Sequence, residues 1–234
     1  MRQNPILVLW DIDGTLLTTG RAGRDALLEA ARECLGDALE LEAVDLRGRL
    51  DSDIWREMTG MRRGGNPAPG EDRFRERYLA SLKRRTDGTK AIRLHPGVRG
   101  LVERLAAEEN TAQGVLSGNY PEIGEYKILR AGLPLETFPV RAWATDGIVR
   151  RDLVPAAMRR YREFSGRPIE AGRVIVVGDT PRDVDCARSN GCRSIAVATG
   201  DAARESLREA GADWICADLS DEDAVLEWIL RHRG

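Results

Sequence analysis

The feature that most constrains this chain is an apolar strand near its N-terminus that ends in two closely spaced aspartates. Residues 6–10 read ILVLW, an unbroken apolar run typical of a strand buried on both faces of a parallel sheet. The segment DIDGT follows directly. Because side chains alternate along an extended backbone, Asp11 and Asp13 point to one side and Ile12 to the other. Carboxylates at the carboxyl end of a central strand lie where open α/β sheets bind ligands, although a solvated Asp-Gly turn is the alternative for this segment alone.

The next part of the chain, residues 18–92, has helical periodicity. Apolar residues recur at helix spacing in residues 26–35 and again in residues 74–82. Between them, Asp51 and Ser52 are predicted to cap a short helix over residues 54–58, and the Gly- and Pro-rich residues 62–70 are predicted to form a loop. The segment is therefore predicted to be a helical insertion that separates the first strand from everything after it.

From residue 94 onward, strand and helix patterns alternate. Strands are predicted at residues 112–116, 140–144, 174–177, 194–198 and 214–216, and helices at 98–108, 121–131, 153–164, 181–190, 201–210 (capped by Asp201) and 223–231. Repeated βα units require a parallel sheet with helices on both faces. The predicted fold is thus α/β, with a doubly wound, Rossmann-like core (residues 1–17 and 93–234) and an inserted α-helical cap (residues 18–92).

The composition excludes few functions, but it argues against some classes of binding partner. The 234 residues carry a formal net charge of −2, which gives no reason to expect a nucleic acid or an anionic membrane as partner. The sequence has no apolar run of transmembrane length and no export signal, and its four cysteines form no CxxC pair. We therefore expect a cytoplasmic protein with reduced cysteines.

Polar residues follow two further predicted strands. Ser117 comes after the strand at 112–116, Asp179 follows the strand at 174–177, and Asp183 lies in the first turn of the next helix. Together with Asp11 and Asp13, the two later aspartates would repel one another by about 4 kcal/mol per pair at roughly 4 Å and an effective dielectric constant near 20. Such a cluster needs a cation or raised pKa values, and an oxygen-only ligand set favours Mg²⁺ over zinc.

Lysine is rare in this chain, and one lysine is placed where it could act. Of the 36 basic residues only three are lysine, namely Lys83, Lys90 and Lys127. A solvated helix position is the alternative for Lys127. The scarcity of lysine in this chain, and the distance of Lys127 after the Ser117 loop, favour a functional role for Lys127.

In this order, the segments DIDGT, LSGN (residues 116–119), Lys127 and GDTPRD (residues 178–183) resemble the four motifs of the haloacid dehalogenase superfamily, closest to its phosphoglycolate phosphatase-like members. The resemblance covers the whole chain, because the helical insertion lies where that family places its cap. It implies that Asp11 is the nucleophile and forms an aspartyl-phosphate, and that Asp13 is the general acid and base. It also implies a Mg²⁺ ion between Asp11, the backbone carbonyl of Asp13 and Asp179, with Asp183 bound directly or through water.

The resemblance assigns the remaining roles as well. Ser117, with Gly118 and Asn119, would bind the phosphoryl oxygens, and Lys127 would neutralise charge on the nucleophile and the transferring group. The substrate would be a small phosphorylated metabolite enclosed by the cap, and the protein a monomer or homodimer. In the cap, residues 48–51 (GRLD) differ from the family's usual GRTD at one position. Arg49 is a candidate for binding a substrate anion, with an exposed, solvated arginine as the alternative.

The prediction is a Mg²⁺-dependent phosphomonoester hydrolase, and two alternatives stay open. A phosphomutase of the same superfamily keeps both aspartates. A non-catalytic phospho-acceptor module of the receiver type is the more distant alternative, since receivers have their acceptor aspartate mid-chain and have no inserted cap. A dehalogenase would need neither Asp13 nor the metal.

Overall fold

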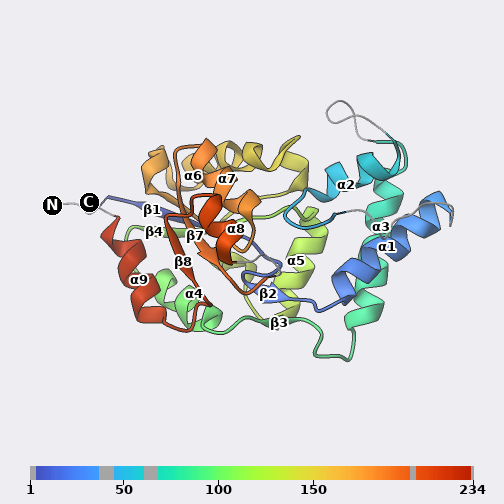
Figure 1. The fold of residues 1–234 in the computed structure, drawn as a ribbon, viewed down its shortest axis with the longest axis horizontal. Coiled ribbons are helices and arrows are strands. Elements are labelled where there is room, and N and C mark those ends of the chain that lie inside the picture. Colours follow the sequence, from blue (N-terminus) through green and yellow to red (C-terminus); the bar gives the residue numbers. More distant parts are fainter. Residues whose placement is uncertain (1–3, 37–44, 61–67, 201–203, 233–234) are drawn as a thin grey trace.

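A computed structural model describes residues 4–36, 45–60, 68–200 and 204–232 of the chain. Six parallel strands form one sheet in the order β5-β4-β1-β6-β7-β8 (Figure 1). Their bounds are β1 Ile6–Trp10, β4 Thr111–Leu116, β5 Val140–Ala142, β6 Val174–Gly178, β7 Arg193–Val197 and β8 Trp214–Cys216. The predicted parallel α/β sheet is therefore confirmed, with the first strand of the chain at its centre.

Helices cover both faces of this sheet: α4 Val98–Ala107, α5 Pro121–Arg130, α6 Leu153–Ser165, α7 Pro181–Ser189, α8 Arg204–Glu209 and α9 Glu222–Arg231. The strand β1 is fully buried, and its alternate side chains enter two separate cores. Leu7 and Leu9 belong to the core that contains the buried residues of α6, whereas Ile6 and Val8 belong to the core that contains those of α4 and α9. A strand covered on both faces explains the unbroken apolar run in the sequence.

The central position of β1 determines where the site lies. Leu9 pairs with Gly114 of β4 on one side and with Val176 of β6 on the other, all in parallel register. The carboxyl ends of the three strands therefore meet at one edge of the sheet, which is the edge where open α/β sheets bind ligands.

Three further helices form the helical insertion: α1 Ala22–Leu35, α2 Asp51–Met58 and α3 Glu71–Thr86. The chain leaves and re-enters the core through a short antiparallel pair, β2 Leu17–Thr18 and β3 Arg93–Leu94. The insertion lies to one side of the sheet, and α1 packs against α3 (Figure 1). Its buried apolar residues belong to the same core as Leu7 and Leu9, and they include Trp55 stacked on Phe74 with ring centroids 4.4 Å apart. Whether residues 18–92 are an independent cap domain stays a prediction.

Two details of the sequence-based assignment are wrong. The helix predicted at residues 54–58 begins at Asp51, and the Asp51 side chain does not cap it; instead its carboxylate accepts the backbone N–H of Tyr120 in the core at 2.9 Å. The strand predicted at 140–144 ends at Ala142 and is followed by a 3-10 turn, Ala144–Asp146. Other boundaries agree within a few residues. The predicted cap Asp201 and most of the predicted loop at 62–70 lie outside the described residues.

Candidate active site

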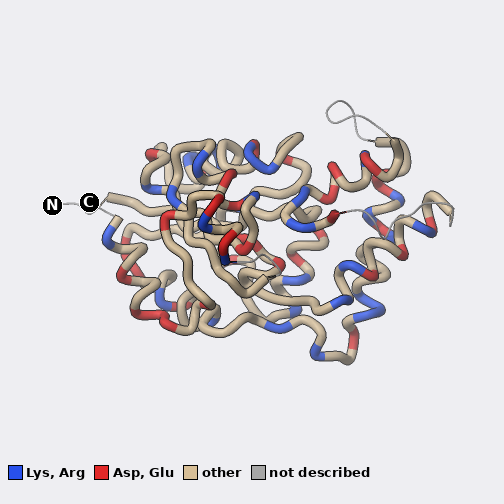
Figure 2. Tube along the Cα trace, viewed as in Figure 1, with Lys and Arg blue, Asp and Glu red and all other residues tan. Residues whose placement is uncertain are grey.

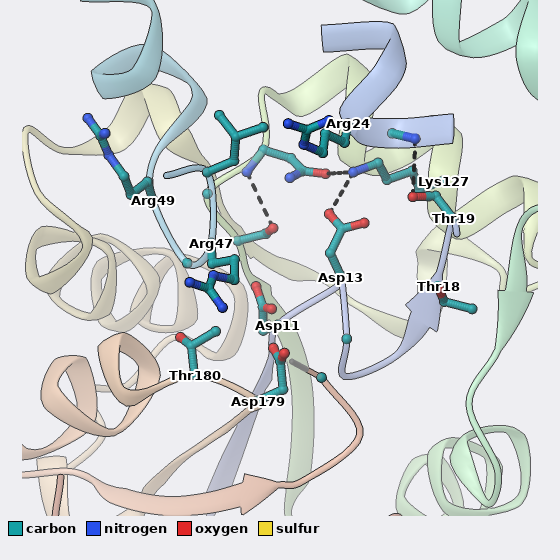
Figure 3. A pocket seen from close by; sticks show the side chains of 18 of the residues that line it. Asp11, Asp13, Thr18, Thr19, Arg24, Arg47, Arg49, Lys127, Asp179 and Thr180 are labelled. Atoms are coloured by element: carbon teal, nitrogen blue, oxygen red, sulfur yellow. Dashed lines mark hydrogen bonds and ion pairs between the residues drawn. The ribbon is translucent and has the colours of Figure 1, made fainter. Parts of the chain in front are cut away.

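A cavity of about 540 Å³ lies between the carboxyl edge of the sheet and the helical insertion (Figure 3). Its core side is lined by the ends of β1, β4 and β6, and its other side by the start of α1, the segment before α2, and Tyr78 of α3. This volume is typical of small-molecule sites in proteins. Most of the predicted site residues line it: Asp11, Asp13, Ser117, Gly118, Asn119, Lys127, Asp179 and Arg49.

Three aspartates meet at the floor of this cavity. Carboxylate oxygens of Asp11, Asp179 and Asp183 all lie within 4.8 Å of one another, and all three residues are buried. The N–H of Asp11 donates to the carbonyl of Val177 on β6, which continues the ladder and fixes Asp11 beside the end of that strand. Asp183, in the first turn of α7, accepts the N–H and the hydroxyl of Thr180 at 3.0 and 2.6 Å. The helix cap and the acidic cluster therefore share one carboxylate.

Arg150 is the functional residue that sequence reasoning missed. Its guanidinium donates to Oδ1 of Asp11 at 2.7 Å and to Oδ1 of Asp183 at 2.5 Å, and the side chain is buried. Burial alone would lower the pKa of Arg150, but the two carboxylates raise it above its ordinary value. The position of Arg150 in the loop after β5 could have indicated this role, because the strand β5 ends at the same edge of the sheet.

The acidic cluster holds more negative charge than Arg150 offsets. Burial raises the pKa of Asp11 and of Asp179, and the neighbouring carboxylates raise both further, although Arg150 opposes the shift. Oδ1 of Asp179 is buried without a hydrogen-bond partner. A Cβ at Gly14 or at Gly200 would overlap the Asp179 carboxylate, so the backbone approaches this group closely on two sides. Three convergent oxygen ligands, one of them unsatisfied, fit a hard divalent cation such as Mg²⁺.

The Asp13 carboxylate is held apart from this cluster by Lys127. The Lys127 ammonium donates to Oδ2 of Asp13 at 2.6 Å and to Oδ1 of Asn119 at 2.7 Å (Figure 3). Lys127 projects from α5 and is 2% exposed, so the alternative of a solvated lysine is wrong. The cation that contacts Asp11 is thus Arg150, whereas Lys127 contacts Asp13.

The loop after β4 packs against the helical insertion and contacts it through hydrogen bonds. Ser117 is buried, its N–H donates to the carbonyl of Ala142 at 3.0 Å, and its hydroxyl accepts the N–H of Asn119 at 3.3 Å. The carbonyl of Gly118 accepts the N–H of Asp51 at 2.7 Å. A Cβ at Gly118 would overlap the carbonyl oxygen of Arg49. Only glycine therefore fits between the loop and the insertion as they are packed here.

The Arg49 side chain extends away from the acidic cluster (Figure 3). It pairs with Asp53 at 2.7 Å and Glu57 at 2.6 Å, both on α2, and its side chain is only 8% exposed. It is therefore neither solvated nor directed at the cluster of Asp11, Asp179 and Asp183. Three other arginines of the insertion also line the cavity: Arg21, Arg24 and Arg47.

Comparison with known proteins agrees with this geometry. The family profile of haloacid dehalogenase-like hydrolases matches residues 8–188. A phosphoglycolate phosphatase from Synechococcus elongatus is 28% identical over 226 residues, covering 96% of this chain and 98% of that protein. Among solved structures, a hydrolase from Pseudomonas syringae superposes with a TM-score of 0.71 at 20% identity over 96% of this chain and 99% of that one. A mutant of CbbY from Rhodobacter sphaeroides, solved in complex with xylulose 1,5-bisphosphate, superposes with a TM-score of 0.71. Its sequence is 21% identical, and the match covers 93% of this chain and 96% of that one.

The chain belongs to the haloacid dehalogenase-like hydrolase family, and the sequence-based recognition of that family is confirmed. Within the family it resembles phosphoglycolate phosphatases along nearly its whole length, with 27–28% identity over 96% of this chain. None of the described helices is both long and apolar enough to cross a lipid bilayer.

Proposed function

We propose that this protein is a Mg²⁺-dependent phosphomonoester hydrolase that acts on a small phosphorylated metabolite, as phosphoglycolate phosphatases do. The observation that carries the proposal is the meeting of Asp11, Asp179 and Asp183 at the floor of a cavity that also contains the Asp13–Lys127 pair. The 540 Å³ of this cavity suit a metabolite and leave little room for a polymer.

Asp11 is the proposed nucleophile. Arg150 holds it through Oδ1, which leaves Oδ2 to attack phosphorus and form an aspartyl-phosphate. The guanidinium keeps its charge at any working pH, so it favours the ionised, nucleophilic form of a carboxyl whose pKa burial raises. When bound by Asp11, Asp179 and Asp183, with the backbone carbonyl of Asp13 as the predicted fourth ligand, Mg²⁺ would offset the repulsion between nucleophile and phosphate.

Asp13 is the proposed acid and base. Its side chain is 40% exposed, in the cavity, and the short contact with Lys127 fixes its orientation. In the first step it donates a proton to the leaving oxygen, and in the second it takes one from the water that hydrolyses the aspartyl-phosphate. Ser117 and the backbone of Gly118 would bind the phosphoryl oxygens, and the Lys127 ammonium, shared with Asn119, would neutralise their charge.

The helical insertion is proposed to act as a cap. It joins the core through the two-stranded β2–β3 connection. It contacts the loop after β4 through Asp51, and it contacts α5 through the Arg75–Glu122 pair, at 2.8 and 2.9 Å. Closure would keep bulk water from the site while the aspartyl-phosphate forms.

The test is release of inorganic phosphate from p-nitrophenyl phosphate and from a panel of sugar phosphates, nucleotides and phosphoglycolate. We expect turnover with Mg²⁺, loss of turnover in EDTA, and loss in Asp11→Asn. Asp185→Asn on the exposed face of α7 is the matched control. Absence of phosphate release from every substrate with Mg²⁺ would contradict the proposal. A phosphomutase would instead convert a sugar phosphate to an isomer without releasing phosphate.

A further inference from the structure

The cavity has arginines on the side of the helical insertion, and most of its carboxylates on the side of the core, where the cations Lys127 and Arg150 pair with them. The acidic residues, Asp11, Asp13, Asp51 and Asp179, belong to the core edge or touch it. The arginines Arg21, Arg24, Arg47 and Arg49 come from the helical insertion on the opposite side. Elsewhere along the described chain, basic and acidic residues are interspersed (Figure 2). A substrate in this cavity therefore has a metal-binding floor on one side and a cationic wall on the other.

Most of the cavity's cations already have anionic partners. Lys127 pairs with Asp13, Arg150 with Asp11 and Asp183, and Arg49 with two carboxylates of α2. Arg47 pairs at 3.4 Å with Asp45, which also contacts Arg182. Within the described part of the chain, the side chain of Arg24 makes no hydrogen bond or ion pair, and the same holds for the side chain of Arg21.

Arg24 is placed to use its charge inside the cavity. It lies in the first turn of α1, and its side chain is on the same side of the cavity as Lys127 (Figure 3). Arg47 lies across the cavity, nearer Asp11 and Thr180 (Figure 3). A cation exposed in a cavity, with no carboxylate to neutralise it, attracts an anion from solution.

We propose that Arg24 binds a second anionic group of the substrate, so that the preferred substrates carry a carboxylate or a second phosphate besides the phosphate that is removed. This inference rests on the proposed function, because the first phosphate occupies the site of Asp11. Arginine presents a planar fork of donors that matches carboxylate and phosphate oxygens equally well, so both anions are admissible at Arg24.

The experiment compares substrates that differ only in the second anion. Phosphoglycolate and 2-hydroxyethyl phosphate share one skeleton, with a carboxylate in the first and a neutral hydroxymethyl group in the second. Xylulose 1,5-bisphosphate and xylulose 5-phosphate form the corresponding pair for a second phosphate. We expect kcat/KM of the wild type to favour the member with the second anionic group in at least one pair by tenfold or more, and the pair that shows the preference identifies the anion.

Variants assign that preference to Arg24. In Arg24→Gln we expect the ratio of kcat/KM within the preferred pair to fall at least tenfold, mainly through KM. In Arg24→Lys we expect part of the wild-type preference to be retained. Arg32→Gln, on the same helix but not among the residues that line the cavity, is the matched control. Equal kcat/KM for both members of each pair in the wild type, or an unchanged ratio in Arg24→Gln, would overturn the proposal while leaving the phosphatase activity intact.

A binding measurement separates this proposal from the proposed function. In the Asp11→Asn protein, titration calorimetry with phosphoglycolate and with 2-hydroxyethyl phosphate reports recognition without turnover. We expect tighter binding of phosphoglycolate, which has the second anionic group, and loss of that difference when Arg24→Gln is added. If the wild type releases no phosphate but this difference persists, the hydrolase mechanism fails and the anion site stands. If phosphoglycolate binds no more tightly than 2-hydroxyethyl phosphate, and xylulose 1,5-bisphosphate no more tightly than xylulose 5-phosphate, the anion site fails.

Discussion

Asp51 links the helical insertion to the core, and its protonation controls the stability of that link. It is 4% exposed; its N–H donates to Gly118, and its carboxylate accepts the N–H of Tyr120. Burial raises the pKa of Asp51 from 3.8 to about 7, against the attraction of Lys127 and the hydrogen bond from Tyr120. Since the folded state then binds the proton more tightly than the unfolded state, the contribution of Asp51 to stability is greatest below pH 4 and falls as the pH rises to about 7.

The substitution Asp51→Asn removes this titration while keeping an oxygen that accepts the Tyr120 N–H. Each pKa unit corresponds to about 1.4 kcal/mol, so the shift of Asp51 amounts to roughly 4 kcal/mol, of which about 2 kcal/mol falls between pH 5 and pH 7. We therefore expect the free energy of unfolding of Asp51→Asn, relative to the wild type, to increase by about 2–3 kcal/mol between pH 5 and pH 8.

Urea unfolding at pH 5, 6, 7 and 8, followed by circular dichroism, measures this difference directly. Asp72→Asn on α3 is the control, because that side chain is 97% exposed. If the variant and the wild type lose stability in parallel over this range, or if the variant becomes relatively less stable at pH 8, then the buried Asp51 carboxyl does not carry the energetic cost argued here.

Three further predictions concern the site itself. Lys127→Met should lower kcat for phosphate release at least a hundredfold, because the transferring group and Asp13 lose the buried ammonium; a decrease below threefold would refute the role. Gly118→Ala should lower kcat/KM about tenfold, since the new methyl group displaces the insertion at the carbonyl of Arg49, and an unchanged kcat/KM would show that the contact is dispensable. The substitution Arg150→Met should lower the free energy of unfolding by about 3–5 kcal/mol in EDTA and by less in Mg²⁺, as measured by urea unfolding. Equal losses in both conditions would argue against a cation site at the carboxylates that Arg150 contacts.

The sheet could be predicted because its strands have a distinctive composition. Residues 6–10 and 174–177 are continuous apolar runs that end in aspartate, which is the pattern of buried parallel strands with a site at their carboxyl ends. Helix spacing likewise predicted the first and third helices of the insertion, and the short helix between them was predicted from Asp51 and Ser52 as a cap. The cap role given to Asp51 was wrong because a carboxylate at a helix start can accept from any nearby N–H, and here the donor Tyr120 lies 69 residues away in sequence.

The anionic half of the site could be predicted from the sequence, but the cationic half only in part, and the reason is compositional. Aspartates stood out by their spacing after strands, and Lys127 by the scarcity of lysine. Arginine supplies all but three of the 36 basic residues, so its presence at any one position conveys little. What distinguishes Arg150 and Arg24 is their partners: the fold encloses Arg150 between two carboxylates and leaves Arg24 facing a cavity without one. Because pairing depends on residues up to 139 positions apart, only the folded chain shows which arginine is structural, which supports the nucleophile and which is left to bind a ligand.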